Sequence, residues 1–133
     1  MNDMINMAAT RGIADRFHFP GFMRGKQVYE PFADSDVYVM PSVSEPFGIS
    51  PLEAMQCGVP SIISKQSGCA EILDKCIKTD YWDIYAMADA MYSLCTNESL
   101  HEYLKVEGKN EVDQITWEKV GERIYNVYSS LIH

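Results

Sequence analysis

Short apolar runs bounded by turn residues alternate along this chain with longer segments in which apolar residues recur every three or four positions. The short runs predict four strands, at residues 17–19, 37–40, 61–64 and 76–79. The longer segments predict helices at residues 2–11, 26–32, 51–57, 67–73, 80–95, 98–112 and 117–131. Strands that alternate with helices in this order predict an α/β fold with a parallel sheet.

The last helices of this pattern carry apolar stripes, which we interpret as core-facing surfaces. In the segment 80–95 the stripe consists of Ile84, Met87, Ala88, Met91 and Leu94. In the segment 117–131, for which Thr116 is the expected N-cap, it consists of Val120, Ile124, Val127, Tyr128 and Leu131.

Residues 41–55 follow the second apolar run and combine a polar loop with the start of a helix. Ser50 is the expected N-cap, Pro51 suits the first helical position, and Glu53 completes a Ser-x-x-Glu capping box. Gly58 is expected to end the helix in the left-handed conformation. Because ligands of open α/β sheets bind where strands end and helices begin, this loop is the first candidate site.

Two carboxylates, Glu45 and Glu53, bracket the loop with seven residues between them. Gly48 lets the backbone approach a ligand closely, and the following helix start attracts anions. Carboxylates accept hydrogen bonds from sugar hydroxyls, so the set indicates a ligand with hydroxyls and phosphates. Two plainer interpretations stay open: Glu53 serves only the capping box, and Glu45 is simply solvated.

Composition narrows the class of protein. The chain of 133 residues has the size of one domain, and its net charge of −8 argues against nonspecific binding to nucleic acid or acidic lipid. The four cysteines form no metal-binding pattern and are interpreted as reduced, packed thiols, which favours the cytoplasm. No metal site is predicted, and no cofactor.

Several ordered motifs resemble one family. They are Phe-Pro-Gly at residues 19–21, Ala-Asp-Ser-Asp-Val at 33–37, Glu-Pro-Phe-Gly-Ile-Ser-Pro-Leu-Glu at 45–53, Gly-Val-Pro at 58–60, and Gly68 with Glu71. Together they are similar to the retaining glycosyltransferases of the Glu-x7-Glu type, in the glycosyl transferase group 1 family with the two-domain GT-B fold. The resemblance implies that residues 1–133 are a truncated C-terminal, nucleotide-sugar-binding domain with a Rossmann-like three-layer α/β/α architecture. The first two β-α units and the N-terminal acceptor domain would be absent.

The resemblance also implies roles for individual residues. Glu45 would meet the donor sugar as the catalytic residue, and Glu53 would bind the ribose hydroxyls. The family's donor-lining segment matches Phe47, Gly48, Ile49 and Ser50. The resemblance also implies that the loop of Met23 and Arg24 lies near the nucleotide base. Arg24 and Lys26 are placed to reach a phosphate, although two basic residues on a loop are more often a solvated surface feature.

The implied function is transfer of a sugar from a nucleotide-diphosphate sugar to a saccharide or lipid-linked acceptor held by the N-terminal domain. This chain alone would be inactive, and the full-length enzyme cytoplasmic or membrane-peripheral. The alternative is a non-catalytic nucleotide-sugar-binding or interaction module. A glycosidase pair is disfavoured, because it needs both carboxylates flanking one bond about 5–5.5 Å apart.

The resemblance implies the strand order 3-2-1-4-5-6, of which this chain holds the third to the sixth strands. We therefore predict a parallel core of residues 37–40, 61–64 and 76–79. Residues 17–19 would either pair directly with 37–40 or be displaced from the sheet. An edge left open at 37–40 would recruit a second copy of the chain, giving a homodimer.

Overall fold

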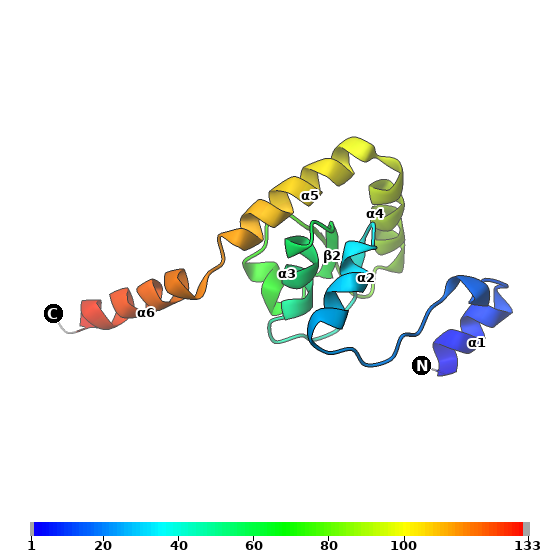
Figure 1. The fold of residues 1–133 in the computed structure, drawn as a ribbon, viewed down its shortest axis with the longest axis horizontal. Helices are drawn as coiled ribbons and strands as arrows, with labels where there is room; N and C mark the ends of the chain where they lie inside the picture. The colour runs from blue at the N-terminus through cyan, green and yellow to red at the C-terminus, as the bar shows by residue number, and fades with distance from the viewer. Residues whose placement is uncertain (1, 132–133) are drawn as a thin grey trace.

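The computed structural model describes residues 2–131, which form a small α/β domain (Figure 1). Its helices are α1 (Asn2–Thr10), α2 (Tyr29–Ala33), α3 (Ile49–Gln56), α4 (Ile84–Thr96), α5 (Glu98–Asp113) and α6 (Trp117–Leu131). Its strands are β1 (Tyr38–Met40), β2 (Ser61–Ser64) and β3 (Ile77–Thr79). Short 3-10 turns lie at Ala14–Arg16, Gly25–Val28 and Gly68–Glu71.

The three strands form one parallel sheet in the order β1-β2-β3. Tyr38 lies opposite Ser61, and Ile63 lies opposite Lys78. The predicted parallel core of residues 37–40, 61–64 and 76–79 is therefore confirmed, with its order and direction.

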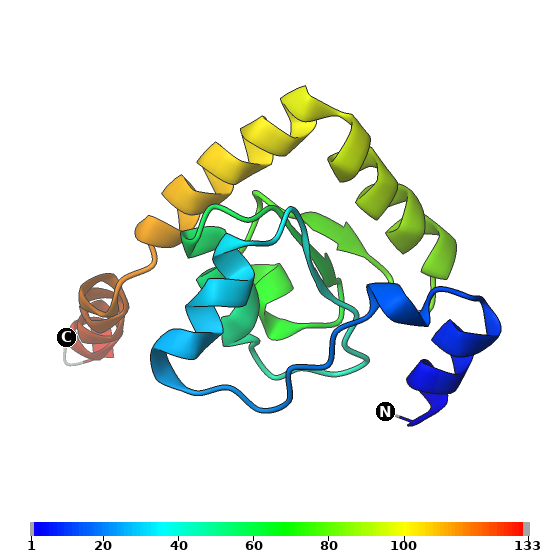
Figure 2. The ribbon, with the colours of Figure 1, turned by 45° about the vertical axis from the view of Figure 1, so that its right-hand side comes forward.

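Side chains alternate across the sheet, so each face is covered by its own layer. Ile63 packs with Met40, Met55 and Leu73 on the face covered by α3. Ile62, one residue earlier, packs with Ala90, Leu94 and Leu104 beneath α4 and the first half of α5. Figure 2 shows the sheet between these helices. Ile62 and Ile63 are both fully buried, and each contributes about 1.5–3 kcal/mol of hydrophobic stabilisation.

The second half of α5 is bonded to the end of α3 and to residues 74 and 75, which precede β3. The Glu111 carboxylate accepts hydrogen bonds from the backbone N–H groups of Asp74 (2.8 Å) and Lys75 (2.9 Å). The Lys109 ammonium donates to the Gln56 carbonyl at 3.0 Å. Gly108 is buried against Met55, because a Cβ there would lie 3.1 Å from the Met55 methyl carbon.

The strand predicted at residues 17–19 does not form. Phe17 and Phe19 stack on each other instead, with ring centroids 6.3 Å apart, and both are more than 40% exposed. Within residues 2–131 no strand pairs with residues 17–19, and α2, which follows them, packs against α3. Of the two predicted outcomes, displacement is the one observed.

As a result, β1 has a free edge. Within residues 2–131 it pairs only with β2. The Tyr38 N–H donates to the Pro60 carbonyl, and alternate residues of a parallel strand bond to the same neighbour. The N–H and C=O of Val39 therefore face the unpaired side.

The apolar stripe of α6 is not part of the core, contrary to prediction. Its five residues are between 38% and 75% exposed, and Figure 1 shows α6 projecting away from the rest of the chain. The stripe of α4 is core only in part: Leu94 is buried, whereas Ile84 and Met91 are exposed. Helical periodicity identifies the apolar face of a helix, but a neighbouring element must be present to bury it.

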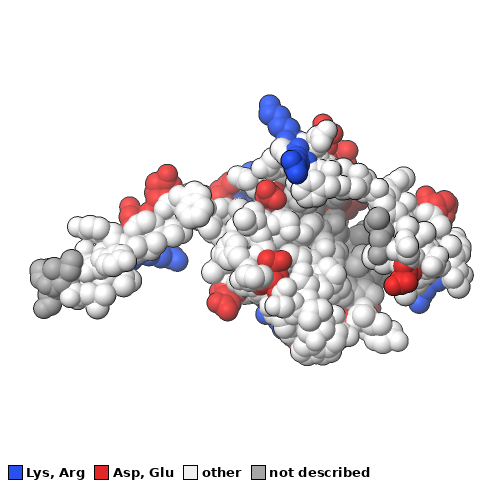
Figure 3. Space-filling model, turned by 90° about the horizontal axis from the view of Figure 1, so that it is seen from below, with Lys and Arg blue, Asp and Glu red and all other residues white. Residues whose placement is uncertain are grey.

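Charge is spread over the surface. On the face shown in Figure 3, acidic side chains are scattered over the body and no broad basic patch gathers. Within residues 2–131, no helix combines the length and the apolar character that crossing a membrane requires.

Candidate functional site

Helix α3 begins at Ile49, two residues earlier than a Ser50 cap requires, and this changes the start of the site. Gly48 is the N-cap, with φ 87° and ψ 86°, and no side chain caps the helix. The capping box of Ser50 and Glu53 is therefore wrong. The Ser50 hydroxyl instead shares a 2.7 Å hydrogen bond with the Tyr38 hydroxyl. Since Glu53 has no capping role, that plainer interpretation of it is removed.

Gly48 is required at the bend for two reasons. Its φ lies in the left-handed region that side chains disfavour. A Cβ there would also lie 3.0 Å from the Met40 methyl carbon, 3.1 Å from Cγ of Glu45 and 3.3 Å from Sγ of Cys69. The loop backbone is thus packed directly on the end of β1 and on the turn after β2.

That turn, residues 64–69, holds the loop through its backbone. The Gly68 N–H donates to the Glu45 carbonyl at 2.9 Å, and the Cys69 N–H donates to the Phe47 carbonyl at 2.7 Å. Glu45 and Ser67 form an isolated parallel bridge. The parallel pairing of β1 with β2 therefore resumes beyond both strands and fixes the Glu45 backbone. Ser67 occupies the N-cap position of the 3-10 turn Gly68–Glu71, but its hydroxyl does not bond to that turn and donates to the Ser64 carbonyl at 2.6 Å.

Tyr38 lies beneath this loop and was not identified from the sequence. Burial raises the pKa of its hydroxyl; the hydrogen bond to Ser50 acts in the opposite direction. Negative charge on Cys69, Glu53 and Glu45 raises the pKa further, so both glutamates lie close enough to Tyr38 to influence it. The signal in the sequence was the alternation along β1, which puts Tyr38 and Met40 on the α3 face.

The two glutamates are free to act as acceptors. Both are partly buried, and within residues 2–131 no ion pair or side-chain hydrogen bond engages either carboxylate. Between them, Phe47 is 40% exposed and Ile49 is 66% exposed. The structure thus brings Glu45, Phe47, Gly48, Ile49, Ser50 and Glu53 together around the first turn of α3.

Met23 and Arg24 belong to a different part of the surface. Met23 lines a cleft of about 430 Å³ beside α2 with Pro20, Phe22, Gln27, Glu30, Pro31 and Asp34. The Arg24 guanidinium lies 5.2 Å from the centroid of the Phe22 ring. No residue of the loop 45–53 lines this cleft, so the structure does not bring the two predicted parts of the site into one cavity.

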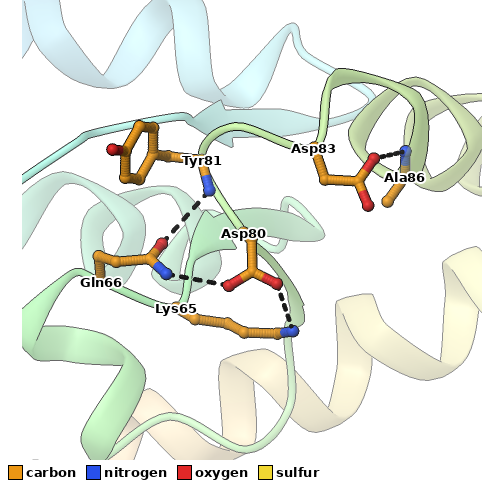
Figure 4. Close-up of polar contacts among 6 residues, drawn as sticks. All are labelled: Lys65, Gln66, Asp80, Tyr81, Asp83 and Ala86. Carbon is orange, nitrogen blue, oxygen red and sulfur yellow. Dashed lines mark hydrogen bonds and ion pairs between the residues drawn. The ribbon is translucent and has the colours of Figure 1, made fainter.

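The turns after β2 and β3 are joined by a polar network that sequence reasoning missed. The Asp80 carboxylate accepts hydrogen bonds from the Lys65 ammonium and the Gln66 amide, both at 2.9 Å (Figure 4). These bonds, that from Lys65 first, lower the pKa of Asp80. Asp83 rather than Asp80 begins α4, because its carboxylate accepts the N–H of Ala86 at 2.9 Å.

An apolar cleft of about 430 Å³ lies between the loop 45–53 and the start of α6. It is lined by Phe47, Leu52, Ile115, Thr116, Trp117 and Val120. Phe47 therefore forms one wall of this cleft as well as part of the loop. Among residues 2–131, no group of three or more His, Cys, Asp or Glu side chains is arranged to hold a metal ion.

Comparison with known proteins agrees with this architecture. A glycosyltransferase of Methanocaldococcus jannaschii is 30% identical over 123 residues, which cover 88% of this chain and 31% of that protein. Sucrose-phosphate synthase from Thermosynechococcus elongatus superposes with a TM-score of 0.82 at 24% identity, over 98% of this chain and 34% of that one. Anabaena HepE, solved in complex with UDP-glucose, gives 0.83 at 20% identity, over 97% and 36%.

The chain thus spans about a third of the length of these proteins. The family model of glycosyl transferases group 1 matches residues 2–111, which include all three strands, the loop 41–48 and α3. This chain belongs to the glycosyl transferases group 1 family.

Proposed function

We propose that this chain is the donor-binding part of a retaining glycosyltransferase that uses a nucleotide-diphosphate sugar. The observation that carries the proposal is the pair of unengaged carboxylates, Glu45 and Glu53, on either side of the α3 N-terminus. Family membership supports sugar transfer, and the UDP-glucose bound to Anabaena HepE supports this class of donor.

Each part of the loop has a task in this proposal. Glu45 contacts the transferred sugar as the catalytic residue, and Glu53 accepts hydrogen bonds from the ribose hydroxyls. The diphosphate lies at the start of α3, where unpaired N–H groups and the positive end of the helix dipole favour anions. Phe47, Gly48, Ile49 and Ser50 line the path between them. Dipoles aimed at the departing diphosphate would supply the charge stabilisation that is usually the largest catalytic term.

Tyr38 is a further residue of the proposed site, in addition to those predicted from the sequence. Its hydrogen bond holds the Ser50 hydroxyl in the first turn of α3, next to the proposed diphosphate position. We assign Tyr38 a positioning role, because its hydroxyl contacts Ser50. Met23 and Arg24 remain the proposed contacts to the nucleotide base; the separate cleft at Met23 means that a donor must reach across to them, or that their loop must move.

The chain spans about a third of the length of the relatives described above. We propose that residues 1–133 are a partial C-terminal domain and that an N-terminal domain binds a saccharide or lipid-linked acceptor. On this view the chain alone binds donor weakly and transfers no sugar, and the complete enzyme works in the cytoplasm or at a membrane surface.

The test compares Glu45→Gln and Glu53→Gln with a matched control, Glu102→Gln. Glu102 is an exposed glutamate on α5, and within residues 2–131 its carboxylate pairs only with Lys105 and His101, on α5 itself. Binding of UDP-glucose is measured by saturation-transfer NMR at millimolar donor, and transfer is measured in the complete protein. We expect both loop variants to weaken binding, and Glu45→Gln to abolish transfer. The unfolding free energy should stay within about 0.5 kcal/mol of the parent, because among the described residues 2–131 neither loop carboxylate has an ion pair or side-chain hydrogen bond to lose.

Three outcomes have distinct meanings. Equal binding by the parent and both loop variants contradicts the donor site. Binding that depends on Glu45 without any transfer by the complete protein supports instead a non-catalytic nucleotide-sugar-binding module. Loss of binding in Glu102→Gln as well shows that the change reflects general charge rather than this site.

A further inference from the structure

We propose that Gly68, which bears no side chain and is remote in sequence from the loop, is a positioning residue for Glu45. The inference rests on the proposed function, because it concerns how the Glu45 carboxylate is held in the donor site. Gly68 would act through the loop backbone and would not itself touch the sugar.

The first argument is that the hydrogen bonds holding the loop come from the backbone around Gly68. Its own N–H reaches the Glu45 carbonyl, and the next N–H, of Cys69, reaches the Phe47 carbonyl. These two bonds bracket Pro46, which has no N–H to donate. The parallel bridge between Glu45 and Ser67 joins the same two segments, so the position of Glu45 depends on this turn.

The second argument is steric. A Cβ at Gly68 would lie 2.0 Å from the Pro46 carbonyl oxygen, 2.8 Å from its carbonyl carbon and 3.0 Å from Cα of Phe47. Contacts shorter than 3.0 Å are essentially never seen for a real Cβ, and the atoms met here are backbone that cannot rotate away. The loop would have to retreat by about 1 Å (3.0 minus 2.0 Å). Gly68 has no positive φ, so close approach alone requires glycine here.

The third argument is that the turn is itself anchored and cannot yield easily. Ser67 and Cys69, on either side of Gly68, are buried, and the Ser67 hydroxyl donates to the Ser64 carbonyl. The Ser64 hydroxyl donates to the Ser42 carbonyl at 2.6 Å, which ties the start of the loop to the end of β2. A side chain at Gly68 therefore displaces the loop 45–47 rather than the turn.

A side chain at Gly68 would change the position of the Glu45 carboxylate but not its charge. A displacement of about 1 Å at a reacting group can cost about 10²-fold in rate. We expect Gly68→Ala to reproduce the effect of Glu45→Gln although the carboxylate is still present. Because both variants would disable the same group, their losses should not add in the double variant.

The experiment uses the 133-residue chain, UDP-glucose as the probe and backbone-amide NMR. The variants are Gly68→Ala, Glu45→Gln, the double variant, and the control Gly121→Ala, whose Cβ would meet nothing within 4 Å. We expect Gly68→Ala to shift the amides of residues 45, 47 and 69 and to speed hydrogen exchange at residue 69. Exchange at Ile62 and Ile63 should stay slow. Affinity for UDP-glucose should fall as much as in Glu45→Gln and no further in the double variant.

Additive losses in the double variant would overturn the proposal, since Gly68 would then act independently of Glu45. Unshifted loop amides in Gly68→Ala would overturn it as well. If Gly68→Ala does not fold, Ser64→Ala takes its place, because it frees the Ser42 carbonyl without introducing any clash. That variant should likewise shift residues 42–47, and unchanged loop amides would count against the role of the turn.

The design separates this inference from the proposed function. If the parent chain shows no response to UDP-glucose at any concentration, the donor assignment fails. The amide shifts then decide alone whether Gly68 sets the position of Glu45.

Discussion

Gly48 and Gly58 lie at opposite ends of α3. Replacing Gly48 by alanine should destabilise the chain far more than replacing Gly58. Both have positive φ, +87° at Gly48 and +79° at Gly58. They differ in surroundings. A Cβ at Gly58 would meet the Lys105 side chain at ordinary distances, 3.6 Å to Cγ and 4.0 Å to Cε, whereas one at Gly48 would lie 3.0 to 3.3 Å from Met40, Glu45 and Cys69.

The expected losses of stability follow from two effects, the backbone conformation of each glycine and the packing around it. Left-handed backbone costs a non-glycine residue about 1–2 kcal/mol, and this applies at both positions. Overpacking a well-filled site costs about 1–3 kcal/mol more, and this applies only at Gly48, where Met40 and Cys69 are buried. We therefore predict losses of about 1–2 kcal/mol for Gly58→Ala and about 2–5 kcal/mol for Gly48→Ala. The effect of alanine on the unfolded chain is shared and cancels in the comparison.

Urea unfolding followed by circular dichroism measures both variants against the parent. The m-values should agree, so that differences in midpoint report stability alone. Equal losses for the two variants would refute the reasoning, because the crowding at Gly48 would then have no energetic consequence and the loop would not be packed as described. A large loss at Gly58 alone would show that backbone conformation outweighs packing at both ends of α3.

Three further predictions use other parts of the chain. Burial raises the pKa of the Cys76 thiol to about 12, so at pH 8 we expect Cys76 to react with iodoacetamide far more slowly than the exposed Cys95, as read from labelled peptides by mass spectrometry; equal rates would contradict this. The pKa of Asp80 is lowered in the folded chain, so its bonds to Lys65 and Gln66 stabilise the fold above the carboxyl group's ordinary value of 3.8 and lose this effect as pH falls through the lower, folded value. In Lys65→Met the free energy of unfolding should therefore fall less steeply with decreasing pH below 3.8. An unchanged dependence on pH would argue against the network. The free edge of β1 should pair with a second copy of the chain, opposed only weakly by the net charge of −8 because salt screens charges over about 10 Å, so sedimentation velocity should show a dimer; a monomer at all concentrations would contradict it.

The sheet was predictable because its signals are local. Residues 61–64 form a strand with the predicted bounds, since a Gly-Val-Pro turn precedes them and polar residues follow. Gly58 is left-handed as predicted, at the end of α3. Thr116 also begins α6 as predicted, with its hydroxyl accepting the N–H of Lys119 at 3.4 Å.

The errors arose where a distant partner decided between local alternatives. A Ser50 cap would contribute about 1 kcal/mol, but the bend at Gly48 permits two backbone hydrogen bonds from the turn 64–69, at about 0.5–1.5 kcal/mol each. Residues 17–19 have the composition of a strand, yet within residues 2–131 no strand pairs with them. The α6 stripe identifies an apolar face but not what covers it.

The candidate site shows the same division. The positions of Glu45 and Glu53 around the start of α3 followed from spacing alone. Tyr38, Gly68 and the network at Asp80 could not be found in the same way, because each matters through residues that are 12 to 23 positions away in sequence. Such contacts depend on the parallel register of β1, β2 and β3, which the apolar pattern does not specify.

The most direct test of the donor site is a titration of the isotopically labelled 133-residue chain with UDP-glucose, followed by backbone-amide NMR. We predict weak binding in the millimolar range, with the largest shifts at residues 45–50 and 67–69. A further cleft is lined by Asp36, Leu94, Cys95, Thr96, Glu98 and His101. Largest shifts in that cleft or along α6, with residues 45–50 unmoved, would contradict the assignment of the donor to the Glu45 loop.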